Sequence, residues 1–192
     1  MEWTNADTEY LRTFCDGSKV DSDDIRFKQI IKQELLNDKY IIHVLNNKEL
    51  EEAEAEPDEY FGINILPYYL IKPTQTDSEN FLCYELNSGE SRTWETKVQQ
   101  LIFYILVHQG DGNIVETTTG LARHDLLAAL VLDHFNWTNL FGERIHCVSD
   151  QASVVDDEYS CRTLIFEQET DNNLAKTPAS STRARMVNKS FR

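Results

Sequence analysis

The sequence has no long uninterrupted run of apolar residues. The longest such run, residues 101–107, is far shorter than the about 20 residues that a helix needs to span a bilayer. The first residues, Met-Glu-Trp-Thr, contain neither a basic segment nor an apolar one, so we expect no secretory signal. We therefore expect a chain that has no membrane partner.

Basic residues are also scarce. The 192 residues contain 18 lysines and arginines against 33 aspartates and glutamates, which gives a net charge of −15. Such an excess repels phosphate groups, so it excludes binding to the outside of nucleic acid through a general positive field. Hydrophobic residues still make up 41% of the chain, which excludes a disordered acidic protein. The length is that of one domain.

Paired cysteines and catalytic motifs are missing. The four cysteines have no C-x-x-C spacing, and Cys83, Cys147 and Cys161 lie in apolar, strand-like segments. We expect buried free thiols and a reducing compartment. The chain contains no G-x-G-x-x-G, no G-x-x-x-x-G-K-[ST] and no G-x-S-x-G motif, and its five histidines are isolated from one another. We expect no enzymatic activity, no metal and no cofactor.

Helical spacing of apolar residues predicts three helices, over residues 21–36, 40–45 and 120–137. The acidic residues at the start of the first can cap free N–H groups there. His124 and Asp125 are successive in the third helix. Successive helical residues diverge by about 100°, so we interpret this pair as an interface or capping pair rather than a catalytic dyad.

Apolar runs predict five strands, at residues 67–73, 81–86, 98–108, 144–149 and 160–168. Residues 87–90 read as a turn, and residues 154–158 read as an acidic hairpin loop. The strand at 98–108 is apolar on both faces, so both should be covered, by helices or by a neighbouring subunit. The order of elements predicts an α+β fold in which N-terminal helices and one long helix pack on a mainly antiparallel sheet.

Charge divides the chain into regions. Residues 49–59 contain seven acidic residues and no basic one, which predicts a solvated loop. Residues 172–192 contain five cations and no acid, so they carry +5 and residues 1–171 carry −20. We divide the chain into an N-terminal arm or short helix at 1–20, an α+β domain at 21–171, and a basic extended C-terminal arm at 172–192.

Two stretches of the sequence together resemble a known group of proteins. The first comprises Asp58-Glu59-Tyr60-Phe61-Gly62-Ile63-Asn64-Ile65-Leu66-Pro67-Tyr68, Thr74-Gln75-Thr76 and Phe81-Leu82-Cys83-Tyr84-Glu85. The second comprises Gly120-Leu121-Ala122-Arg123-His124-Asp125-Leu126-Leu127-Ala128, Phe141-Gly142, Val148-Ser149-Asp150 and Tyr159-Ser160-Cys161-Arg162-Thr163-Leu164-Ile165-Phe166. They resemble the small neck proteins of tailed bacteriophages, the head–tail connector and tail-terminator group, over roughly residues 20–170.

The resemblance implies a structural virion protein. The α+β domain at 21–171 would then be ring-forming. Six or twelve copies would form a ring that joins or terminates the tail at the head–tail interface and surrounds the DNA channel. Genomic DNA would pass through without specific binding. The neighbours would be adjacent neck proteins, portal-side adaptors or tail-tube proteins. The location would be the virion neck or tail, after assembly in the host cytoplasm.

This interpretation predicts three sets of site residues. The subunit interface would comprise Leu101, Phe103, Tyr104, Ile105, Arg123 and Asp125. The docking arm would use Arg183, Arg185, Met186, Val187 and Phe191. The acidic channel or surface loops would comprise Glu51, Glu52, Glu54, Glu56, Asp156, Asp157 and Glu158.

Other classes of protein stay open. A compact body carrying −20 could imitate DNA and occupy the basic groove of a nucleic-acid-binding defence protein, with residues 49–59 in place of phosphates. The basic residues after 171 argue against this alternative, because a DNA mimic gains nothing from them. A small enzyme or a eukaryotic adaptor module is the third alternative. The mass of the protein in solution separates a ring from a monomer.

Overall fold

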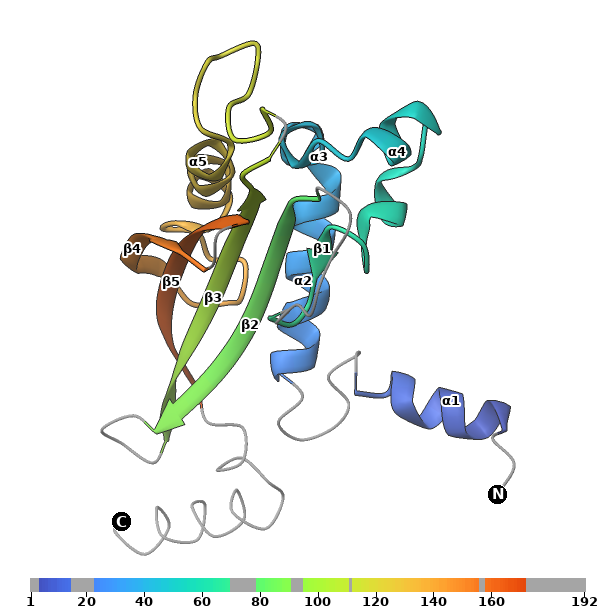
Figure 1. Ribbon diagram of the computed structural model, residues 1–192. Coiled ribbons are helices and arrows are strands. Elements are labelled where there is room, and N and C mark those ends of the chain that lie inside the picture. Colours follow the sequence, from blue (N-terminus) through green and yellow to red (C-terminus); the bar gives the residue numbers. More distant parts are fainter. Residues whose placement is uncertain are drawn as a thin grey trace, which may run out of the picture.

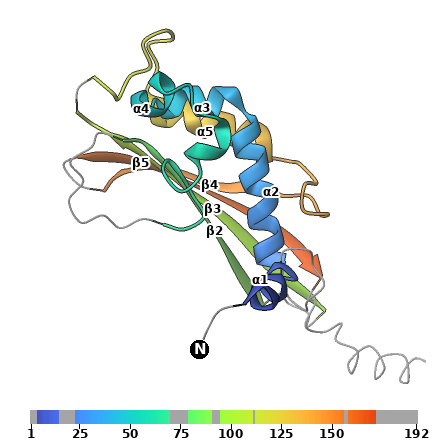
Figure 2. The ribbon, with the colours of Figure 1, turned by 90° about the vertical axis from the view of Figure 1, so that its right-hand side faces the viewer.

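A five-stranded sheet with helices on one of its faces forms the body of the protein (Figures 1 and 2). The computed structural model describes residues 4–14, 23–69, 79–90, 95–110, 112–155 and 158–171. The strand order is β1-β2-β3-β5-β4. The strands are β1 (Ile65–Leu66), β2 (Phe81–Glu90), β3 (Thr96–His108), β4 (His146–Val154) and β5 (Tyr159–Asp171).

The sheet is antiparallel except at one edge. β2, β3, β5 and β4 pair antiparallel in that order, and only the short β1 runs parallel to its neighbour β2. The central strand β3 pairs along its whole length with β5, from Thr96 opposite Asp171 to His108 opposite Tyr159. The expected α+β class with a mainly antiparallel sheet is confirmed.

The helices gather on one side of the sheet, as Figure 2 shows. They are α2 (Asp23–Asn37), α3 (Lys39–Leu45), α4 (Lys48–Glu52), the 3-10 helix η1 (Pro57–Tyr60) and α5 (Arg123–Phe135). The first helix, α1 (Asn5–Arg12), has no buried residue and stands apart from the sheet in Figure 1. α2 begins within the predicted acidic segment, although Asp24 accepts hydrogen bonds from Gln99 and Ser88 of the strands. The Asp38 side chain caps α3 by accepting a hydrogen bond from the Tyr40 N–H.

The core lies between the helices and alternate residues of the strands. From β3 it takes Leu101, Phe103 and Ile105, all of which are fully or almost fully buried. α5 contributes a stripe that Phe135 completes, whereas His134 turns to Asp38, with 2.6 Å between Nε2 and Oδ2. Burying one large apolar side chain such as Phe103 contributes about 1.5–3 kcal/mol. The apolar layer between strands and helices therefore dominates the stability of the fold.

The acidic segment at 49–59 is not the single loop that its composition predicts. The Asn47 side chain accepts a hydrogen bond from the Leu50 N–H and starts α4. Pro57 occupies the first turn of η1, where a proline costs no backbone hydrogen bond. Capping and proline geometry therefore override charge repulsion here. The acidic side chains of the segment are nevertheless exposed.

Strand boundaries also differ from those the sequence predicts, among them the end of β4, which continues to Val154 rather than ending at residue 149. Residues 67–69 form no strand, residues 70–73 lie outside the described residues, and the parallel strand lies just before them in β1. Residues 87–90, which read as a turn, continue β2 and pair with β3 from Asn87 opposite Gln100 to Glu90 opposite Lys97. Pairing with a long partner strand outweighs the turn preference of Asn-Ser-Gly.

Candidate functional site

The face of the sheet opposite the helices is the first candidate surface. Alternation along the strands divides the apolar residues into the main core and a smaller cluster on this face. The smaller cluster contains Leu66, Phe81, Cys83, Leu106, Tyr159 and Cys161, with Tyr69 and Tyr104 packed against it. The rings of Tyr69 and Tyr104 lie 4.4 Å apart between centroids. We name this side of the sheet the helix-free face.

The helix-free face carries acidic groups and no arginine or lysine among the described strand residues. Glu85, Glu167 and Glu169 lie on it by the alternation of β2 and β5. Gln100 donates a hydrogen bond to Glu167 across the strands, at 2.6 Å. Lys28 reaches Glu85 from α2, with 2.8 Å between Nζ and Oε2. Apart from this contact, the charge of the face is negative.

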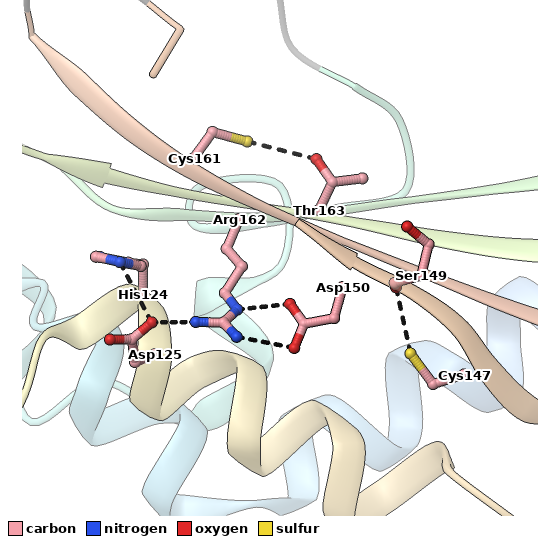
Figure 3. A network of polar contacts seen from close by, with 8 residues as sticks. All are labelled: His124, Asp125, Cys147, Ser149, Asp150, Cys161, Arg162 and Thr163. Atoms are coloured by element: carbon pink, nitrogen blue, oxygen red, sulfur yellow. Dashed lines mark hydrogen bonds and ion pairs between the residues drawn. The ribbon is translucent and has the colours of Figure 1, made fainter. Parts of the chain in front are cut away.

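An ion-pair network joins the start of α5 to the edge of the sheet (Figure 3). The Arg162 guanidinium donates to both carboxylate oxygens of Asp150, at 2.7 and 2.8 Å, and also pairs with Asp125. The hydrogen bonds to Asp150 are the main cause that raises the pKa of Arg162. His124 lies 3.3 Å from Asp125, between Nε2 and Oδ1. The two residues therefore meet, although helical geometry predicted that they diverge.

The predicted interface residues fall into different environments. Leu101, Phe103 and Ile105 are buried beneath helices of the same chain, so they offer no surface to a neighbouring subunit and this part of the prediction is wrong. Helices of the same chain cover that face of β3. The sequence had left open whether helices or a neighbouring subunit would do so. Tyr104 lies half-buried on the helix-free face. Asp125 is exposed and pairs with Arg162.

Arg123 is a buried residue rather than a surface cation. Its Nη1 donates to the Val44 carbonyl at 3.3 Å, and its Nε has no hydrogen-bond partner. Burial lowers the pKa of the guanidinium, while Glu116 and Glu51 act in the opposite direction. Arg123 fastens α5 to the end of α3 and lies below the surface that a partner could contact.

Of the predicted acidic residues, Glu51, Glu52, Glu54, Glu56 and Glu158 are exposed. Asp156 and Asp157 lie outside the described residues. The same holds for every residue of the predicted docking arm: Arg183, Arg185, Met186, Val187 and Phe191. Exposure leaves the acidic side chains available to a partner.

Sequence reasoning missed a cluster of five asparagines at one end of the sheet. Asn46 donates to Asn113 at 3.0 Å, and Asn113 donates to Asn80 at 2.7 Å. Asn47 donates to Asn64 at 2.8 Å, and the Asn64 side chain donates to the Asn80 carbonyl. All but Asn46 are buried. The cluster ties the helices to the residues that follow β3.

We name residues 112–122, which include Asn113 of this cluster, the β3–α5 loop. It projects beyond the end of the sheet at the top of Figures 1 and 2. Its Glu116 side chain is buried and accepts hydrogen bonds from the N–H groups of Thr118 and Thr119, at 2.8 and 2.7 Å. These bonds lower the pKa of Glu116 to about 2. The buried Glu116 carboxylate thus holds the tip of the loop together by accepting hydrogen bonds from its backbone.

Within the described ranges, no group of three or more histidine, cysteine or acidic side chains could hold a metal ion. Cys83 and Cys161 are buried free thiols, as expected, whereas Cys147 is free but only partly buried. Cys15 lies outside the described residues. Burial raises the pKa of the Cys147 thiol.

Among the residues that the structure describes, no helix is both long and apolar enough to cross a membrane.

Comparisons with known proteins give a family match, similarity to solved structures and one negative result. No curated protein matches the sequence. A chain in a solved structure titled "Virion of native gene transfer agent (GTA) particle" is similar to it, with a TM-score of 0.46 and 12% sequence identity. That similarity covers 75% of this chain and 93% of the other. The sequence model of the YomW family matches residues 38–168. These residues include α5, the asparagine cluster and the sheet as far as Gln168 of β5. The chain belongs to the YomW family.

Proposed function

We propose that this protein is a structural component of a bacteriophage virion, and that it forms a ring in the neck around the DNA channel. The two sequence stretches that resemble neck proteins support the proposal. In the structure, the first stretch contributes β1 and β2, and the second contributes α5, β4 and β5. Copy number would be six or twelve, as the resemblance implies.

The observation that carries the proposal is the helix-free face. Its apolar cluster is buried, but beyond this cluster the face carries Glu85, Glu167 and Glu169. It is negative apart from the Lys28 contact, and it lacks arginine and lysine among its described residues. A wall of this charge lets phosphate groups pass without holding them. In a ring, this face would be directed to the channel or to the adjacent subunit.

The proposal assigns the protein no catalytic step and no bound metal. His124 and Asp125 contact each other, but Arg162 engages the Asp125 carboxylate, so we assign the pair to fastening α5. A stoichiometric metal found by elemental analysis of the purified protein would contradict this part of the proposal. So would an activity that is lost on changing His124 or Asp125 alone.

The test is the mass and symmetry of the purified protein. We expect rings in micrographs and a sixfold or twelvefold mass in solution, or capture by isolated phage tail tubes or connectors. A chain that stays monomeric at every concentration and also fails to bind these assemblies contradicts the proposal.

The acidic-mimic alternative has one observation in its favour, the exposed carboxylates of α4 and its flanks, Glu51, Glu52, Glu54 and Glu56. It predicts a monomer that binds a basic nucleic-acid-binding protein and that competes with DNA for it. The same mass measurement distinguishes this outcome from a ring.

A further inference from the structure

The β3–α5 loop differs from the rest of this acidic chain in its surface. Across residues 112–122 the only charged residue is Glu116, and its side chain is directed inward, with 3% of the residue exposed. The loop instead exposes two aliphatic side chains, Val115 at 43% and Leu121 at 54%. Thr117, Thr118 and Thr119 between them are exposed as well. The loop therefore presents a neutral surface of methyl groups and hydroxyls.

The loop is held in one shape by its own backbone. The Glu116 N–H donates to the Leu121 carbonyl, and the Gly120 N–H donates to the Glu116 carbonyl, both at 2.8 Å. Val115 and Ala122 form an isolated antiparallel bridge. Gly120 has φ of 69°, a left-handed conformation that glycine adopts without the steric cost of a side chain.

The base of the loop is fixed to the body as well. Asn113 is buried between Asn46 and Asn80 and bonds to both. The Arg123 N–H donates to the Ile114 carbonyl at 2.8 Å. A segment that is fixed at its base and closed at its tip loses little conformational freedom on binding, and this saving strengthens association.

The position of the loop restricts which partner could cover it. It continues from the end of β3 along the strand direction, past the end of the sheet (Figure 1). β5 ends at Asp171 opposite Thr96, at the other end of the thirteen-residue β3, which is about 40 Å away at about 3.3 Å per residue. A subunit placed beside the sheet would contact its edges or faces. A protein stacked on this end would instead bury the loop.

We propose that the β3–α5 loop is a preformed docking element that inserts into an uncharged recess of a different virion protein stacked on this end of the molecule. This inference rests on the proposed virion function. The contact would be formed by Val115, Leu121 and the threonine hydroxyls. Because it contains no exposed charge, its strength would change little with ionic strength, unlike any contact made through the acidic surface.

The experiment uses virion assemblies isolated from cells that lack this chain, incubated with the purified full-length protein. Val115→Asp and Leu121→Asp each place a charge on the exposed side of the loop, so we expect ring mass to be unchanged and capture to weaken by about tenfold or more. The matched control is Ile25→Asp, since Ile25 is 41% exposed and lies at the start of α2. We expect that variant to be captured like the unaltered protein.

A second variant tests preorganisation separately from the apolar surface. Glu116→Gln keeps the size of the side chain and leaves Val115 and Leu121 in place, but it replaces a carboxylate acceptor with an amide. We expect faster hydrogen exchange at the Thr118 and Thr119 amides together with weaker capture. Capture that stays unchanged while exchange becomes faster would overturn the preorganisation argument.

The remaining outcomes separate the two proposals. If Val115→Asp and Leu121→Asp are captured as well as the unaltered protein, the loop inference is wrong and the virion function stands. If these variants fail to form rings, the loop contacts a copy of the same chain, and stacking on a different protein is wrong. If the unaltered protein is captured by no virion assembly and forms no ring, both proposals fail.

Discussion

Glu116 is the residue whose titration reports most directly on the β3–α5 loop. Its folded-state pKa is depressed from 4.5 to about 2 by hydrogen bonds from Thr118 and Thr119. A depressed carboxylate pKa stabilises the fold above the unfolded pKa, and this contribution is lost as the pH falls through the folded pKa. We expect the loop amides to lose protection as the pH falls from about 4.5 through 2, as measured by NMR titration. In Glu116→Gln this pH dependence should disappear; a Glu116 carboxyl that titrates at its usual pKa would contradict the geometry.

Arg162 provides a matched comparison between two carboxylates. Asp150 accepts two hydrogen bonds from the guanidinium, whereas Asp125 is the more exposed partner, at 51% against 30% of the side chain. We expect Asp150→Asn to lower the free energy of unfolding by about 1 kcal/mol, because a two-point contact is stronger than a single exposed one. Asp125→Asn should cost no more than about 0.5 kcal/mol. Chemical denaturation measures the free energy of unfolding of both variants. An equal loss in the two would show that the two-point contact is no stronger than the single one.

Sequence reasoning at the residue scale identified Arg123 and Asp125 but not their partners. Asp125 meets Arg162, which lies 37 residues further along the chain, and Arg123 meets the carbonyl of Val44, 79 residues earlier. The asparagine cluster joins residues that are 67 and 33 positions apart. No local pattern encodes such contacts, because each depends on where α3, α5 and the sheet meet.

At the scale of elements, successive residues of β3 lie on opposite faces of the sheet. Phe103 is fully buried beneath the helices, and the next residue, Tyr104, is half-buried on the helix-free face. We expect Phe103→Ala to lower the free energy of unfolding by about 3–5 kcal/mol, since it leaves a cavity in the main core. Tyr104→Ala should cost about 1–2 kcal/mol, because part of its ring already contacts water. Denaturant unfolding of both variants tests the assignment; equal costs would contradict it.

A charged substitution on each face should have a different consequence. Leu101→Asp places an unpaired charge in the main core, so we expect it to prevent folding. Tyr104→Asp leaves its charge in reach of water, so we expect a folded chain that assembles poorly if the helix-free face contacts a neighbour. Circular dichroism checks folding and solution mass checks assembly. A Tyr104→Asp variant that forms normal rings would place the helix-free face outside the subunit contacts.

Elements with strong periodicity were predictable and those that depend on pairing were not. The apolar residues of β3 and α5 predict a long strand and a helix, with bounds within two to three residues of those observed. The end of β2 was misread, because Asn87, Ser88 and Gly89 favour a turn in isolation and become a strand only against β3. β1 has two residues and a parallel partner, so its sequence is too short to show any period.

At the scale of the whole molecule, charge and position define two different ends. The β3–α5 loop is neutral on its outside and lies past the end of β3 at His108. The chain leaves the sheet at Asp171, opposite Thr96 at the other end of β3, and the residues after it carry +5. Contacts at the loop end should be insensitive to salt, whereas contacts of the basic residues should weaken with it.

The basic residues after Asp171 should affect assembly through their charge. Deleting residues 172–192 removes +5 and leaves −20 on the remaining chain. We expect the truncated protein to fold, because the described sheet ends at Asp171, and to assemble less well, because cations that could pair with acidic neighbours are gone. Salt should weaken assembly of the complete chain, since the Debye length falls from about 10 Å at 0.1 M to about 3 Å at 1 M. Assembly of the truncated chain should be weak at low salt and should improve as salt screens its repulsion.

A matched variant separates charge from apolar contact in the same segment. Replacing Lys176, Arg183, Arg185, Lys189 and Arg192 with glutamine keeps Met186, Val187 and Phe191 in place. If the cations hold the segment to a neighbour, this variant should behave like the deletion in sedimentation at low salt. If the apolar residues hold it, the glutamine variant should assemble like the complete chain and lose only the salt dependence. Rings or particles that form equally well from all three proteins, at physiological and at high salt, would show that the segment is dispensable and that the acidic bodies associate without it.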